Sequence, residues 1–189
     1  MKLRILIICI VSILTLGCAS KKVEATPQQI AALDEMVASK SFVITSEYAL
    51  PLVTNSLSAL QNSRILAPGE NPGRISLINN PNELKINGDL ITSKLPFFGE
   101  IQQSSGYNGS NNSIEFDGAY EDYSATKNED NTYTIKFDAK SKSEKFDVIV
   151  TLYPNLKSQM TVKGNKRFPI RYTGYVAGID PDTSTKPLK

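Results

Sequence analysis

Hydrophobic residues recur with a helical period near the start of the chain and with a strand period after it. In residues 26–40, TPQQIAALDEMVASK, apolar side chains fall at positions i, i+3 and i+7. Thr26 stands as an N-cap with Gln29 three residues later, which is the arrangement of a capping box. The pattern predicts one helix that covers a sheet with its apolar face. That face consists of Ile30, Leu33 and Val37.

From residue 41 on, polar and apolar residues alternate, which is the spacing of half-buried β-strands. The runs are short, and turn clusters such as KNEDN and YPN separate them. Asn87-Gly88 predicts a tight hairpin. Connections this short join antiparallel neighbours, because a parallel return needs a crossover of roughly a dozen residues. The predicted strands cover residues 41–50, 74–78, 82–86, 90–95, 113–118, 119–127, 132–139, 146–153, 156–163 and 167–176.

We therefore expect a mainly β fold with one N-terminal helix packed on it. It is an antiparallel meander of about eight to ten strands that forms a curved sheet, half-barrel or barrel; a two-sheet sandwich is the alternative. Pro169 predicts an edge position or a bulge for the last strand. The run 146–153 is apolar on both sides, so it is expected to be central and covered on both faces. A single domain spans residues 26–176, with a flexible tail over 177–189.

The first 17 residues have the order of a secretory signal peptide. Two cations precede the apolar run from Ile5 to Leu16, which is shorter than the roughly 20 residues of a transmembrane helix. Cys18 follows Gly17, and this ending resembles the lipobox of bacterial lipoproteins, which implies a lipid on the Cys18 thiol. Cleavage by ordinary signal peptidase is the alternative. Several acyl chains make such an anchor essentially permanent.

The residues after Cys18 bear on localisation. Residues 18–25 are short and unpatterned, as expected of a tether. Ala19 rather than Asp follows the cysteine, which by the enterobacterial rule implies the outer membrane. Lys21 and Lys22 differ from the acidic stretch of surface-exported lipoproteins, so we expect the periplasmic face.

Charge and composition exclude several functions. The chain has 21 Lys and Arg against 19 Asp and Glu, and a cleaved leader removes Lys2 and Arg4, so the mature charge is near zero. A polybasic contact with nucleic acid is therefore not expected. The sequence contains no histidine, which excludes Ser-His-Asp and Cys-His catalysis. We expect no catalytic residue, no metal and no cofactor, although a carboxylate-based hydrolase is not fully excluded.

Acidic residues and one polar loop are further candidate sites. Glu115, Asp117, Glu121 and Asp122 lie within eight residues, but a solvated strand face explains them better than calcium or catalysis. The loop SSGYNGSNNS, residues 104–113, offers Tyr107 as a possible contact.

The stretch KRFPIRYTGY combines cations and tyrosines that could bind an anion or a polymer. Arg167 and Arg171 are expected on one strand face and Tyr172 on the other. A final edge strand protected by charge is the simpler interpretation.

The stretch SKLPFFGE, residues 93–100, places two rings side by side in a chain with few aromatic residues. Pro96 favours an extended conformation before it, so Phe97 and Phe98 should face opposite ways. A corner buried between two layers is the simpler interpretation, and a contact with a ligand or partner is the alternative.

These stretches also carry a family resemblance. NELKINGDLITSKLPFFGE, IEFDG, YTIKFDA, FDVIVTLYPN and IRYTGYV, together with the lipobox, resemble Bacteroidetes lipoproteins classed as a domain of unknown function. A Leu-Pro-Tyr/Phe-Phe-Gly signature marks that family. The resemblance covers about residues 41–176, and its most specific parts are Leu95 to Gly99 and Tyr172 to Gly174. It implies location and domain extent but no activity.

Two functional hypotheses follow. The first is a non-enzymatic binding or structural module, held by lipid in the envelope, whose partner is an unknown envelope protein or component. The alternative is a carrier or chaperone for a hydrophobic ligand in a half-barrel cavity. A large cavity between helix and sheet would favour the carrier, and a filled core would favour the module.

Overall fold

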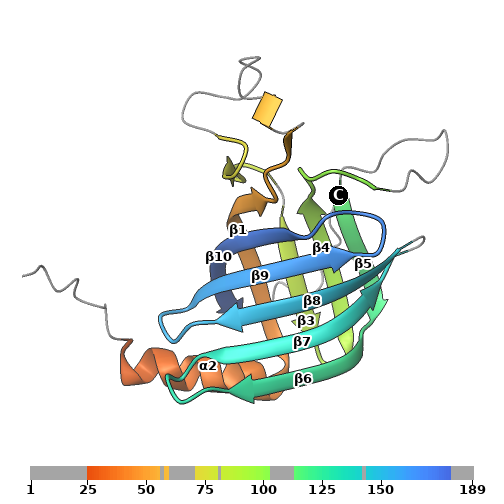
Figure 1. The fold of residues 1–189 in the computed structure, drawn as a ribbon. Helices are drawn as coiled ribbons and strands as arrows, with labels where there is room; N and C mark the ends of the chain where they lie inside the picture. The colour runs from red at the N-terminus through yellow and green to blue at the C-terminus, as the bar shows by residue number, and fades with distance from the viewer. Residues whose placement is uncertain are drawn as a thin grey trace, which may run out of the picture.

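The computed structural model of this protein describes residues 25–55, 58–59, 71–80, 82–102, 113–141 and 144–179. Cys18, its tether and Tyr107 lie outside these residues, and so does the tail from residue 180 on. Figure 1 shows one curved, barrel-shaped sheet with a helix across its lower end.

The helix begins where the capping box predicted. Helix α2 spans Pro27–Ser39, the Thr26 side chain accepts a hydrogen bond from the Gln29 backbone N–H, and the Gln29 side chain accepts one from the Thr26 N–H. Lys40 ends the helix in the left-handed conformation, at a φ of 50°. The buried side chains of α2 are Leu33, Met36 and Val37, so Met36 joins the predicted face while Ile30 stays partly exposed.

Ten strands follow the helix in the described residues. Each matches one of the predicted runs, although β2 is far shorter than expected. The strands are β1 (Ser41–Pro51), β2 (Ile75–Ser76), β3 (Glu83–Asn87), β4 (Leu90–Pro96), β5 (Ser113–Ala119), β6 (Glu121–Lys127), β7 (Tyr133–Lys140), β8 (Lys145–Leu152), β9 (Lys157–Gly164) and β10 (Ile170–Gly178).

The sheet is an up-and-down meander whose first and last strands pair with each other. Its order is β5-β4-β3-β1-β10-β9-β8-β7-β6, all neighbours are antiparallel, and β2 pairs with β1 beside this path. The barrel is thus closed by strand pairing except between β5 and β6. These two strands are consecutive in the chain, with only Tyr120 between them. In Figure 1 the strands β3 to β5 run upright at the back while β6 to β9 cross in front of them. The predicted mainly β meander with one helix is confirmed, in the barrel-shaped form.

Two predictions for single strands are wrong. The last strand, β10, is not an edge strand, because it pairs with both β1 and β9. Pro169 precedes the first residue of β10, so its missing N–H removes no ladder hydrogen bond. Strand β8 is central but not covered on both faces, since Ile149 is 43% exposed while its neighbours Val148 and Val150 are buried. The strand β10 also continues two residues beyond its predicted end.

The β3–β4 hairpin differs from its prediction by one residue. The prediction left residues 87–89 between the two strands; in the structure Asn87 pairs with Leu90, so the loop consists of Gly88 and Asp89 alone. Gly88 has a φ of +60°, as the first loop position of a type II′ turn requires. The hairpin holds the end of the helix, because the Gly88 N–H donates to the Lys40 carbonyl at 2.9 Å and Lys40 Nζ lies 3.1 Å from an Asp89 oxygen.

The middle of the helix is tied to the front strands. Lys127 of β6 donates to Asp34 at 2.7 Å, and the Tyr133 hydroxyl of β7 donates to Asp34 at 2.8 Å. The hydrogen bond from Lys127 lowers the pKa of Asp34. Burial, with Asp34 beside it, raises the pKa of Tyr133 to about 12. Helix α2 is therefore held against the lower end of the barrel through polar contacts at its middle and at its C-terminal end.

The inner faces of the strands meet in one hydrophobic core. Side chains of the back and front strands touch across it, as in the edge-to-face pair Phe116 and Phe146, whose ring centroids are 5.1 Å apart. The helix adds Leu33, which is completely buried. Apolar burial of this kind is the main stabilising term of the fold.

Candidate functional site

Three of the predicted contact residues lie inside the protein, at the upper end of the barrel. We call this group, Phe97, Glu144, Arg167 and Tyr172, the end plug. The Phe97 ring is 5% exposed and lies 4.6 Å from the guanidinium carbon of Arg167. An Arg167 Nη is 2.8 Å from a Glu144 carboxylate oxygen, and both side chains are nearly inaccessible. The plug is therefore a desolvated ion pair stacked on an aromatic ring.

Tyr172 connects the plug to the segment after β4. Its hydroxyl donates to the carbonyl of Pro96 at 2.9 Å, and burial raises the pKa of this tyrosine. Residues 95–99 and 172–174, two of the stretches on which the predicted family resemblance rests, thus touch each other. Their shared feature is a structural contact in the protein interior.

The segment that follows the two phenylalanines joins the loop between β9 and β10. The Phe168 N–H donates to the Glu100 carbonyl at 3.1 Å, and the Gln102 N–H donates to the Lys166 carbonyl at 2.7 Å. Phe98 is only partly buried against the core. Of the two rings, Phe97 closes the barrel end and Phe98 is the one that reaches solvent, as their opposite directions predicted.

Arg167 and Arg171 were expected on one strand face, and this is wrong. Arg167 precedes β10 and bends over the core rings Phe97 and Phe146. Arg171 lies in β10, is exposed and points outward. The reason is that the strand begins only at Ile170, so strand alternation does not reach Arg167.

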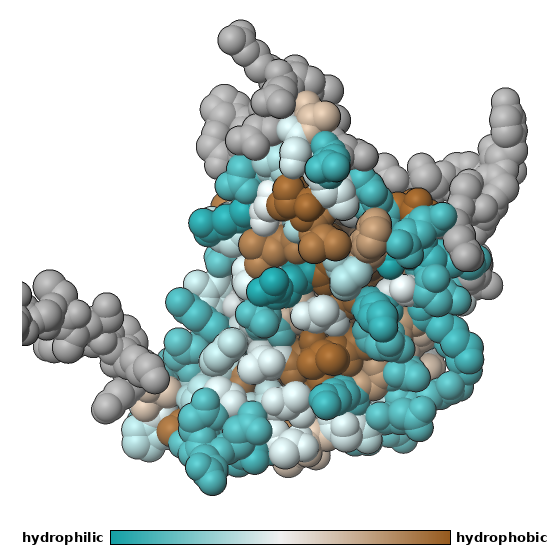
Figure 2. Space-filling view, in the orientation of Figure 1, coloured by the Kyte–Doolittle hydropathy of each residue, from teal (hydrophilic) through white to brown (hydrophobic). Residues whose placement is uncertain are grey.

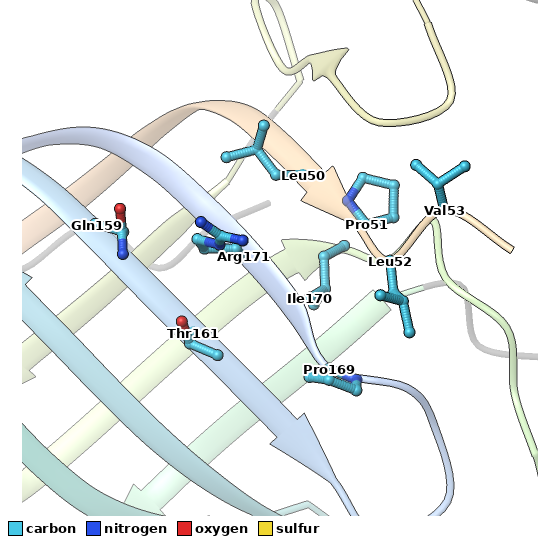
Figure 3. A pocket seen from close by; sticks show the side chains of 9 residues that line it. All are labelled: Leu50, Pro51, Leu52, Val53, Gln159, Thr161, Pro169, Ile170 and Arg171. Carbon is cyan, nitrogen blue, oxygen red and sulfur yellow. The ribbon is translucent and has the colours of Figure 1, made fainter.

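The outer face of β1, β9 and β10 carries two hollows that border each other at Gln159. The upper one, the leucine hollow, has a volume of about 400 Å³, and Figure 3 shows Arg171 extending between the side chains of β1 and those of β9. Leu52 and Val53 in its wall are each about half exposed. Figure 2 shows hydrophobic residues gathered toward the upper end of this face, framed by hydrophilic ones. The leucine hollow is lined by Leu50, Pro51, Leu52, Val53, Gln159, Thr161, Pro169, Ile170 and Arg171.

The second, the tyrosine hollow, has a volume of about 340 Å³. Tyr175 is 46% exposed there, and Arg74 lies 3.9 Å above the ring of Tyr48. Sequence patterns identified only the last strand of this surface, because the tyrosines come from three distant segments. The tyrosine hollow is lined by Glu47, Tyr48, Arg74, Tyr153, Asn155, Lys157, Ser158, Gln159, Thr173, Gly174 and Tyr175.

The acidic residues near β5 and β6 form no metal-binding group in the described part of the chain. Glu115 lies opposite Lys94 in the β4–β5 ladder, and Glu121 pairs with Lys140. Over the described residues, no three Cys, Asp or Glu side chains come together as metal ligands. Nor does any helix among them have the length and apolar character needed to cross a bilayer.

The fold and its outer hollows define a class: a nearly closed, up-and-down β-barrel capped by one helix, with a hydrophobic core and a polar-aromatic outer face. The chain belongs to the family described as "Domain of unknown function (DUF4251)", whose model matches residues 24–176. The predicted family relationship is confirmed. A crystal structure of a DUF4251 family protein from Bacteroides eggerthii is similar, with 13% sequence identity and a TM-score of 0.55 over 80% of this chain and 88% of that one. At this identity the similarity supports the fold. No curated protein matches the chain.

Proposed function

We propose that this protein is a lipid-anchored binding module of the bacterial envelope, without enzymatic activity, that recognises its partner through the outer face of β1, β9 and β10. The anchor is a lipid on Cys18, and the location is the periplasmic face of the outer membrane. The observation that supports this binding surface is the pair of adjoining hollows with exposed tyrosines, arginines and leucines. Tyr and Arg are the residue types that contribute most energy at interfaces.

The packing of the barrel favours a binding module over a carrier. A carrier would need space between α2 and the sheet, whereas Leu33 of the helix is fully buried in a continuous core with Phe42 and Phe137. The leucine and tyrosine hollows lie on the outer face, and a further hollow lies beside the β6–β7 loop. Binding on the outside is thus the better explanation of this surface.

The anchor and the surface are tested separately in cells. For the anchor, Cys18→Ala should abolish incorporation of an alkyne-tagged fatty acid and release the protein from the membrane fraction. Labelling that persists in this variant would contradict lipidation at Cys18.

For the surface, a photo-crosslinking amino acid is placed at Leu52 or Tyr175 in intact cells. Thr92, exposed on the outward face of β4, is the matched control position. We expect one and the same envelope component to be captured from both hollow positions and not from Thr92. Equal capture from all three positions, or none from the hollows, would contradict the proposed surface.

A further inference from the structure

The tyrosine hollow is built from cross-strand rows on the outer face of the sheet. Tyr175 of β10 lies between Thr45 of β1 and Lys157 of β9. In the next row, Thr173 lies between Tyr48 and Gln159. Side chains in neighbouring strands that share a row are about 5 Å apart, so each row offers a continuous strip to one ligand.

The shape of this surface depends on a close approach of two backbones. The pairing of β1 with β10 shifts register between Ser46 and Tyr48. At Gly174, which pairs with Ser46, a Cβ atom would lie 2.0 Å from the carbonyl oxygen of Thr45. The bulge therefore forms only around a glycine, and it gives Tyr48 its place beside Thr173.

The chemistry of the lining is that of a sugar site rather than a peptide site. Three tyrosines, two amides and several hydroxyls line it, and no aliphatic side chain is among the described lining residues. A pyranose ring has an apolar C–H face, which packs on a tyrosine ring, and a rim of hydroxyls, which amides such as Asn155 and Gln159 bind. An extended peptide would need apolar side-chain pockets, which the tyrosine hollow lacks.

The charge of the surface selects the kind of sugar. The two hollows together hold Arg74, Lys157 and Arg171 against the single carboxylate of Glu47. None of the three cations has an ion pair within the described part of the chain. Because the mature chain as a whole is close to neutral, this positive excess is local, and it is complementary to carboxylate groups.

From these observations we propose that the outer face binds an acidic polysaccharide, with sugar rings on Tyr175 and Tyr153 and sugar carboxylates at Lys157 and Arg74. This inference rests on the proposed binding function and names its ligand class. The adjoining leucine hollow, with Arg171 at its border, extends the same path for further sugar units.

The test is binding of the full-length protein, purified in detergent, to polygalacturonate measured by calorimetry. Dextran serves as the neutral glycan and poly-glutamate as the acidic polypeptide. We expect polygalacturonate to bind, dextran to bind much more weakly, and binding to weaken as salt is raised. Tyr175→Ala and Lys157→Gln should each weaken polygalacturonate binding by about fivefold to tenfold. Lys136→Gln, on the outward face of β7, should leave it unchanged.

Each other outcome overturns the inference in a defined way. If poly-glutamate binds as tightly as polygalacturonate, the surface recognises negative charge alone. If dextran binds as tightly as polygalacturonate, the surface does not recognise charge. Loss of binding in Lys136→Gln as well would place the ligand elsewhere. If no glycan binds while Leu52 and Tyr175 still capture one component in cells, the glycan inference fails and the binding function stands. Circular dichroism of each variant establishes that the fold is intact.

Discussion

Two arginines of this protein stack on aromatic rings, and their surroundings give them different roles. Arg167 lies 4.6 Å from the Phe97 ring, is almost inaccessible and pairs with Glu144, which is buried still more deeply. Arg74 lies 3.9 Å from the Tyr48 ring but is exposed, with no ion pair in the described residues. The residue type alone therefore does not determine whether an arginine stabilises the fold or is available for binding. Desolvation commits Arg167 to the fold, whereas Arg74 keeps its donors free for a ligand.

The largest effect is expected from breaking the buried pair. Arg167→Ala leaves the Glu144 carboxylate buried without its partner, and should lower the free energy of unfolding by about 3–5 kcal/mol. Arg74→Ala, the matched change at the exposed stack, should cost less than about 0.5 kcal/mol. Urea denaturation followed by circular dichroism measures both. Similar losses in the two variants would contradict the distinction between the stacks.

A double substitution sharpens this result. Glu144→Leu with Arg167→Met removes both charges and keeps most of the volume. It should recover most of the stability lost in Arg167→Ala, because the cost comes from an unpaired buried charge rather than from the absent pair. A double variant as unstable as Arg167→Ala would mean that the ion pair itself stabilises the barrel end.

The close approach of β1 and β10 should be nearly as sensitive. In Gly174→Ala the added methyl group would collide with the Thr45 backbone oxygen, which lies 2.0 Å from the Cβ position. We expect a loss of about 2–3 kcal/mol or more, since backbone atoms must move to make room. Gly178→Ala, in the same strand and also without positive φ, is the control, because its Cβ would meet only Met36 at an ordinary contact distance of 3.8 Å. Thermal melting of the two variants compares them, and equal shifts would argue against the collision.

A smaller effect is expected at the contact between the two family stretches. Tyr172→Phe removes the hydroxyl that donates to the Pro96 carbonyl and should cost about 1 kcal/mol. Tyr175→Phe, on the outer face, should leave stability unchanged and serves as its counterpart. Chemical denaturation resolves this difference, and a stable Tyr172→Phe variant would show that water replaces the lost donor.

The smallest effect is expected at the helix. Asp34→Asn removes the charge that binds Lys127 and should cost about 0.5–1 kcal/mol at neutral pH, because the pair is largely exposed. The pKa of Asp34 lies below its ordinary value of 3.8, so its contribution is present above that pH and is lost as the pH falls through the lowered value. The two proteins should therefore converge in stability once the pH falls below the lowered pKa of Asp34. A difference that persists in acid would mean that Asp34 acts through packing rather than charge.

Local signals predicted much of the fold. The capping box at Thr26 marked the first turn of α2, and alternation marked the strands, because both depend on neighbours within a few residues. Errors arose where one residue shifts a boundary: the hairpin turns at Gly88–Asp89, and Pro169 stands before rather than within β10. A proline within a strand favours an edge position, because it has no N–H for the ladder, whereas a proline just before the strand also allows a central position. Sequence spacing alone does not resolve that difference.

The candidate site residues, too, were only partly predictable from the sequence. Phe97, Arg167 and Tyr172 were chosen for their chemistry, but the tertiary structure buries them together. Tyr48 and Arg74 carried no signal, since a surface assembled from β1, the segment before β2 and the turn after β8 is not a pattern along the chain. Cys18 and Tyr107 lie outside the described residues and stay predictions.

The sequence by itself determined the periods of the helix and strands, the antiparallel connections and the charge balance, because these follow from local geometry and from counting. Only the tertiary structure decided that the first strand pairs with the last, since that contact joins residues more than a hundred positions apart. This closure places Arg167 in the interior and brings Tyr48 beside Thr173 and Gln159. Burial in the closed barrel, rather than residue type, thus separates the residues that hold the fold from those that are free to bind.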